Sequence, residues 1–319
     1  MATKTAIAFP EPHWLVTEPE PGRLSFSPDE FFEELASWDL SINLSISALR
    51  GAMLVFDFKN YPGANIASNL PAAQHFDALV SATQTQVALM NAFAYCLHVA
   101  RITEENHATD GFRVRHKDLI FTQDSPSLAM SGSAITHLQM IPGVGFSAIN
   151  PPRFEAIPET TIAAACELLG FIVQHEVTNA LDLVVLTNDA MVSYRDHEFS
   201  SALVTAWTVC EALLTYHWRE YIEDPKRQSM TSKRSKKLTG RDFTASVITE
   251  VLELAGVVTP ELLKQIDRVR AARNKWMHAT QSPNREIAGD SLSLATTMLG
   301  WTLGRRLPIS LSIRAQGWQ

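Results

Sequence analysis

The sequence contains little cysteine, and its cysteines are far apart. Its 319 residues include only Cys96, Cys166 and Cys210, with no Cys-x-x-Cys pair. Three distant cysteines within apolar stretches form no disulfide framework, and they do not supply a tetrahedral zinc site. We therefore expect reduced, buried thiols in a cytoplasmic protein.

A long apolar run and a secretory signal are also missing. Charged or amide side chains interrupt every hydrophobic segment before the roughly 18 residues that a membrane-spanning helix needs. Residues 1–23 contain Pro10, Pro12, Pro19 and Pro21, without a basic segment followed by an apolar one. This start predicts an extended arm rather than a signal peptide, and we expect no membrane contact.

Positive charge is scarce, because the formal net charge is −7. Such a surface does not bind nucleic acid all over, so any RNA contact must be local. The exception is a basic segment without acidic residues, composed of Lys226, Arg227, Lys233, Arg234, Lys236, Lys237 and Arg241. It is either a solvated connection or a site for phosphate groups. Base stacking is not expected there, because the segment contains no aromatic residue.

Apolar residues recur mostly at helical intervals, so we expect an all-α protein. A capping sequence at Ser27 predicts a helix through Leu35, and residues 41–56 then predict the second arm of a helical hairpin. Residues 71–105 predict a long amphipathic helix. Glycines and prolines in residues 112–157 indicate a loop or a short hairpin.

A boundary is expected near Pro158. Residues 1–158 would form a mostly helical region for sensing or assembly, and residues 159–319 an antiparallel helical bundle. Within this second part, periodicity and caps predict helices over 160–191, 196–220, 243–254, 259–278 and 285–303.

The helix expected from Thr259 carries the strongest sign of chemistry. Thr259 can cap free amides, and Pro260 suits the first helical position. At about 100° per residue, Arg273 falls on the same apolar stripe as Trp276. Because an unpaired buried guanidinium costs several kcal/mol, Arg273 needs a carboxylate partner, a cleft, or another subunit opposite it.

The position of His278 also bears on what Arg273 does. His278 lies five residues after Arg273, about 140° around an ideal helix. Their side chains converge only if the helix ends or bends near His278, and the approach to Pro283 favours an end there.

The run Arg273-Asn274-Lys275-Trp276-Met277-His278 resembles the signature of the HEPN superfamily (higher eukaryotes and prokaryotes nucleotide-binding). That signature is Arg, four to six residues and then His, often with Asn, Asp or His directly after the Arg. Residues 206–214 are similar to the first bundle helix of several HEPN proteins, in which an acidic residue is common. This resemblance makes Glu211 the carboxylate expected beside Arg273, either as a structural ion pair or as part of a site. The spacing from Arg101 to His107 also fits, but we interpret it as structural because it lies at the end of a long helix.

The resemblance implies that Arg273 and His278 are catalytic, with Asn274 as a polar positioning residue and Glu211 as a helper. Many HEPN proteins are ribonucleases, typically homodimers with facing motifs that cut RNA without a metal or another cofactor. The chain would then be a metal-independent endoribonuclease of the toxin or antiviral-defence kind, leaving 2′,3′-cyclic phosphate ends. The alternatives are a non-catalytic scaffold of the same fold that holds nucleic acid, nucleotide or protein, and one half of a toxin–antitoxin pair.

Overall fold

The computed structural model divides into two compact units, residues 1–188 and 189–319, which we treat separately. The residues that it describes are 4–9, 13–18, 20, 27–64, 71–106, 111–122, 155–177, 179–224, 236–240 and 243–311. The division falls later in the chain than the boundary expected near Pro158. The reason is that the helix after Pro158, α4 (Glu159–Gln174), packs on a helix of the first unit.

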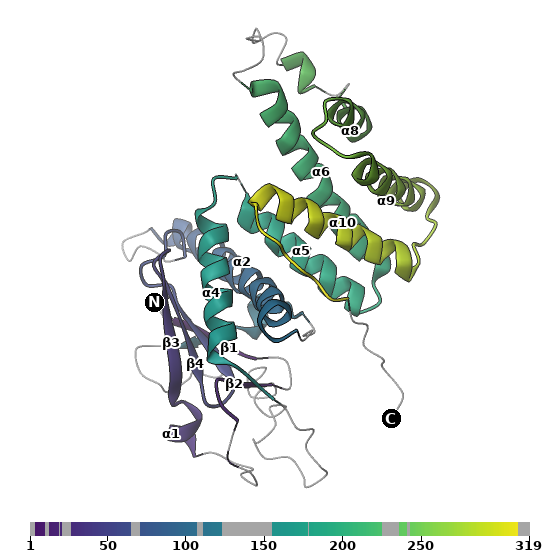
Figure 1. The fold of residues 1–319 in the computed structure, drawn as a ribbon. Helices are drawn as coiled ribbons and strands as arrows, with labels where there is room; N and C mark the ends of the chain where they lie inside the picture. Colours follow the sequence, from purple (N-terminus) through teal and green to yellow (C-terminus); the bar gives the residue numbers. More distant parts are fainter. Residues whose placement is uncertain are drawn as a thin grey trace. The chain divides into compact units, whose positions relative to one another are not determined.

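The first unit contains a five-stranded antiparallel sheet in the order β3-β4-β5-β1-β6 (Figure 1). Its strands are β1 (Lys4–Ala8), β3 (Glu34–Leu40), β4 (Leu44–Leu49), β5 (Met53–Asp57) and β6 (Ile120–Thr122). A second pair, β2 (Trp14–Leu15) and β7 (Ala156–Ile157), is parallel. The expectation of an all-α protein is therefore wrong, and the fold is mixed.

The error arose in residues 41–56, which were expected to be helical. Leu44 and Ile46 are buried while Ser45 and Ser47 between them are partly exposed, which is the two-residue period of a half-buried strand. Asn43 bends the chain with a φ of 60° in the turn before β4. The alternation of apolar residues with serines in this segment is the pattern that indicates a strand.

The helix expected from Ser27 forms, but it is short. The Ser27 backbone amide donates to Glu30 Oε2 at 2.9 Å, and the Glu30 amide donates back to Ser27 Oγ at 3.3 Å. This reciprocal cap starts α1 (Pro28–Phe31). The chain then enters β3 at Glu34, so the expected continuation through Leu35 is wrong.

The long helix expected over residues 71–105 is confirmed as α2 (Ala72–Glu105). Every side chain from residue 89 to residue 101 is buried, so this stretch is the centre of the first unit. Phe93 of α2 packs edge to face on Phe56 of β5, with ring centroids 5.6 Å apart. The neighbouring helix α4 covers another side of α2.

The second unit is helical, in line with the sequence pattern. Its elements are the end of α5 (Ala180–Arg195), α6 (Phe199–Glu223), α8 (Ala245–Leu254), α9 (Pro260–Ala279) and α10 (Arg285–Leu303). Helix α6 packs against α8, α9 and α10. It buries Trp207, Cys210 and Leu213 at intervals of three residues, as expected for the apolar face of a helix.

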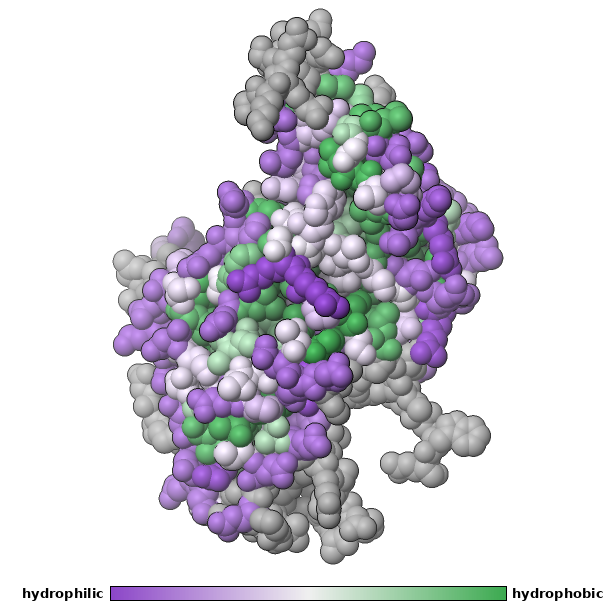
Figure 2. Space-filling view, in the orientation of Figure 1, coloured by the Kyte–Doolittle hydropathy of each residue, from purple (hydrophilic) through white to green (hydrophobic). Residues whose placement is uncertain are grey.

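No helix within the described ranges is long and apolar enough to cross a membrane. Apolar side chains nevertheless reach the surface of the second unit around α8 (Figure 2). Val247 and Leu254, seven residues apart on one face of α8, are 40% and 83% exposed. This face of α8 lacks a covering element among the residues that the structure describes.

All three cysteines are buried and free, as the sequence predicted. Burial raises the pKa of the Cys166 thiol to about 12. It also raises the pKa of Cys96 and Cys210 above the ordinary value. These thiols are therefore protonated near neutral pH and are poor nucleophiles.

The largest fully buried side chain of the described residues is that of Arg101, near the end of α2. Its Nη2 contacts Glu105 Oε2 at 3.2 Å, one helical turn onward. Its Nε and Nη1 atoms have no hydrogen-bond partner in the part of the chain that the structure describes. The second Arg-to-His spacing in the sequence thus starts in the interior, where Glu105 is the one carboxylate of the described residues that pairs with the guanidinium.

We expect Glu105→Ala to lower the free energy of unfolding by about 3 kcal/mol, because it leaves a buried charge without its partner. Adding Arg101→Met should restore most of this loss, since the charge is then gone. Urea titration followed by circular dichroism measures both. Glu104→Ala, an exposed neighbour, is the matched control, and an equal effect of Glu104→Ala and Glu105→Ala would show that the ion pair is unimportant.

Candidate functional site

Helix α9 is built as its sequence predicts. The Leu262 amide donates to Thr259 Oγ1 at 3.2 Å, and Pro260 occupies the first turn. Ile266 and Val269 are buried, while Trp276 on the same stripe is only half-buried. The apolar face of α9 therefore packs in the core along its first half and approaches the surface near its end.

Arg273 lies on this stripe between the buried half and Trp276, and it is half-buried. Its Nη1 donates to Asn274 Oδ1 at 3.2 Å. Its Nε is shielded from solvent and has no hydrogen-bond partner among the described residues. Asn274 thus holds one edge of the guanidinium, and donors remain for an anion from outside the chain.

The expected pairing of Arg273 with Glu211 does not form. Glu211 lies on α6 with its side chain exposed to solvent. Among the described residues, the ion pairs of α9 join Arg268 to Glu286 and Asp290, and Arg270 to Asp267. No carboxylate of the described ranges neutralises Arg273, so its charge is not accounted for by a structural ion pair.

His278 is exposed and does not converge with Arg273. The helix continues through Ala279 and ends at Thr280, whose φ of 50° closes the last turn. The amide of Thr280 donates to the Trp276 carbonyl at 2.9 Å, so this last turn is regular. Arg273 and His278 therefore keep the angular separation of an ideal helix, and the expected convergence within one chain is absent.

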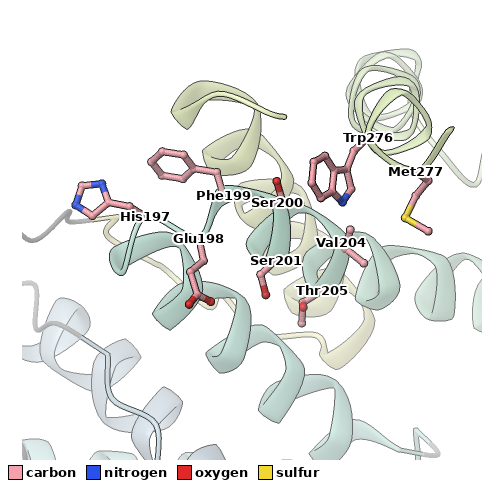
Figure 3. Close-up of a pocket in the computed structure, with 9 residues that line it drawn as sticks. All are labelled: His197, Glu198, Phe199, Ser200, Ser201, Val204, Thr205, Trp276 and Met277. Carbon is pink, nitrogen blue, oxygen red and sulfur yellow. The ribbon is translucent and has the colours of Figure 1, made fainter. Parts of the chain in front are cut away.

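A pocket of about 580 Å³ lies beside the end of α9 (Figure 3). Trp276 and Met277 of α9 form one side, facing the first turns of α6, where Ser200 and Val204 lie. The remaining lining residues are His197, Glu198, Phe199, Ser201 and Thr205. The volume falls in the range of small-ligand sites, and the pocket opens one helical turn after Arg273.

Sequence reasoning missed this pocket, because most of its lining comes from the start of α6. Trp276 carried a signal, since an aromatic residue on a stripe that also holds a polar arginine often marks the edge of a core. The α6 residues carried none, because a pair of serines at a helix start is ordinary capping composition.

The described part of the basic segment is anchored to α6. Lys236 and Lys237 are exposed at the start of residues 236–240. The Trp218 indole N–H donates to the Leu238 carbonyl at 2.9 Å, and the Trp218 ring stacks on Phe243. The other five basic residues, Lys226, Arg227, Lys233, Arg234 and Arg241, lie outside the described residues.

No group of three His, Cys, Asp or Glu side chains that could hold a metal ion occurs in the part of the chain that the structure describes. Comparison with protein-family models, with curated proteins and with solved structures finds no match to this chain.

A stacked pair of rings joins α6 to α10. The His217 imidazole lies 3.8 Å from the Trp301 ring centroid, at an interplanar angle of 14°. Its Nε2 is 2.8 Å from Thr302 Oγ1, whose proton is donated to the Met298 carbonyl. Since the Thr302 hydroxyl is already a donor, it can accept from an N–H at Nε2 of His217.

Burial lowers the pKa of His217 from 6.5 to about 4. The unfolded chain binds a proton at this residue below about pH 6.5, whereas the folded chain does so only below about pH 4. We therefore expect stability to fall as the pH drops through this window, by no more than about 2 kcal/mol because the ring is partly exposed.

Unfolding titrations at several pH values test this expectation for wild type and His217→Phe, which keeps a ring for the stack. The variant should lose this part of the pH dependence. His278→Ala, which removes an exposed histidine, should keep it. An unchanged profile in His217→Phe would assign the effect to other groups.

Proposed function

We propose that this chain is an endoribonuclease that cleaves RNA through attack of the 2′-hydroxyl and needs no metal for that step. The observation that carries the proposal is the state of Arg273. Its guanidinium is half-buried, is oriented by Asn274 and has no carboxylate partner among the described residues. A fixed, uncompensated fork of donors suits a phosphate group.

The reaction requires one group to accept a proton and one to donate it. The 2′-oxygen forms a bond to phosphorus as its proton leaves, and the bond from phosphorus to the 5′-oxygen breaks as that oxygen gains a proton. His278, in the last turn of α9, is the residue we propose for proton transfer. Arg273 would stabilise the charge that develops on the phosphoryl oxygens.

We further propose that two copies of the chain share the site. In one copy, Arg273 and His278 point from different sides of α9, so the second copy's His278 would complete the set around one phosphate. The uncovered apolar face of α8, with Val247 and Leu254, would be buried in such a dimer. Glu211 remains at most a helper, because its side chain is exposed on α6.

We place the protein in the cytoplasm, consistent with its free and buried cysteines. A toxin or antiviral-defence role, with or without an antitoxin partner, follows from the resemblance of residues 273–278 to the HEPN signature. The first unit, with its sheet and α2, would then sense the signal or hold the partner.

A second function is favoured by one observation. The separation of Arg273 and His278 in a single chain suits a protein that binds nucleic acid, nucleotide or a protein partner without cutting RNA. Binding needs Arg273 and the basic segment alone, and it needs no proton transfer.

RNA cleavage assays of the His278→Ala and Arg273→Lys variants distinguish an endoribonuclease from a protein that only binds. We expect His278→Ala to lower the cleavage rate by 100-fold or more, because proton transfer typically contributes about 10² to 10⁴. Arg273→Lys should also be slow, since an ammonium cannot make the two-pronged contact. The assay uses labelled RNA and the matching DNA in excess chelator, with end-group analysis of the products.

His75→Ala, an exposed histidine of α2, is the matched control and should cleave like wild type. RNA cleavage with cyclic phosphate ends that depends on His278 supports the nuclease. Intact RNA with wild type, under conditions where RNA is bound, would establish the non-catalytic function instead.

The basic segment is expected to add affinity that depends on salt. Each phosphate contact with single-stranded RNA contributes about 0.7 to the slope of log affinity against log salt. Lys236→Ala with Lys237→Ala should therefore reduce that slope by about 1.4 and weaken binding to all RNA sequences alike. Fluorescence anisotropy at several salt concentrations measures it, with Lys59→Ala as the control for an exposed lysine. An unchanged slope would show that the segment makes no phosphate contact.

A further inference from the structure

We propose that the pocket beside Trp276 is a nucleobase subsite, which stacks a base of the RNA next to the phosphate held by Arg273. The inference deepens the proposed function and rests on RNA being the ligand, but it does not require that the RNA is cut. It assigns a role to residues of α6 and α9 that the HEPN-like signature does not include.

The position of Trp276 relative to Arg273 is the first support. The two residues are three apart in a regular helix, so their side chains are neighbours on one face of α9. In a nucleotide the ribose joins the phosphate to the base, so these two groups also lie close together. A phosphate at Arg273 therefore brings an adjoining base to the pocket that opens at Trp276.

The state of the two α9 side chains is the second support. Trp276 is half-buried and Met277 is 51% exposed, although both are large and apolar. The indole N–H of Trp276 has no hydrogen-bond partner within the described residues. In Figure 3 the indole faces Ser200 and Val204 across the pocket, so one face of the ring borders open space rather than a packed core.

The side chains that line the pocket suit a nucleobase better than a phosphate group. Trp276, Met277 and Val204 offer apolar surface for a flat ring, and the hydroxyls of Ser200 and Thr205 lie among the polar groups of the pocket. Among the described residues that line it there is no lysine or arginine, and the one carboxylate, Glu198, would repel an anion. Base stacking on an aromatic side chain tolerates all four bases, so we expect dependence on the presence of a base and little dependence on its identity.

The test measures binding, in a His278→Ala background so that the RNA stays intact. Fluorescence anisotropy compares a labelled single-stranded RNA of mixed sequence with an oligomer of the same length that carries ribose and phosphate but no bases. Trp276→Ala should weaken RNA binding by about 5-fold to 100-fold, the effect of losing one stacked base. Its affinity for the abasic oligomer should not change.

Two further variants serve as controls. Trp276→Phe retains an aromatic ring and should bind RNA nearly as well as the parent, which separates loss of stacking from loss of the fold. Trp301→Ala removes a tryptophan that is 41% exposed on α10, away from the pocket, and should leave RNA affinity unchanged. Circular dichroism verifies that each variant is folded.

The outcomes separate this inference from the nuclease proposal. Equal RNA affinity of Trp276→Ala and its parent overturns the base subsite, and so does a parent that binds no RNA. An equal loss for the RNA and the abasic oligomer also overturns it, because the tryptophan would then act on the backbone site. Binding that depends on Trp276, in a protein whose wild type never cleaves RNA, upholds the subsite and removes only the nuclease.

Discussion

Removing a guanidinium group from water costs free energy, and each of the two units contains an arginine whose surroundings depend on this cost. Arg101 is fully buried at the end of α2 and is neutralised by Glu105, one turn away. Arg273 is half-buried on α9, and no carboxylate among the described residues reaches it. Since an unpaired buried charge is costly, we interpret the first arginine as a structural element and propose the second as part of a site.

The residues around Arg273 indicate which kind of ligand such a site would bind. Asn274 holds one edge of the guanidinium, and the pocket at Trp276 opens along the same face of α9. Lys236 and Lys237 are exposed in a segment that Trp218 anchors to α6. On these features we propose a polyanion with flat apolar groups, such as single-stranded RNA, as the ligand, and this proposal is independent of whether His278 takes part in catalysis.

Prediction from sequence succeeded where the signal was local. The cap at Thr259 and the long apolar period of α2 depend on residues within a few turns, so their helices were found with nearly correct ends. It failed in residues 41–56, where β4 pairs with its chain neighbours β3 and β5, and β5 also pairs with the distant β1. A strand is stabilised by its neighbours in the sheet, and its short alternating pattern is easily taken for one face of a helix.

The sequence by itself determined the helices of the second unit, the stripe that places Arg273 beside Trp276, and the burial of the three cysteines, because each follows from local periodicity. Only the tertiary structure decided that Arg273 and Glu211 do not pair, that His278 stays apart from Arg273, and that the start of α6 forms a pocket with the end of α9. These outcomes depend on how α6 and α9 pack, and packing between segments distant in sequence is a property of the whole fold.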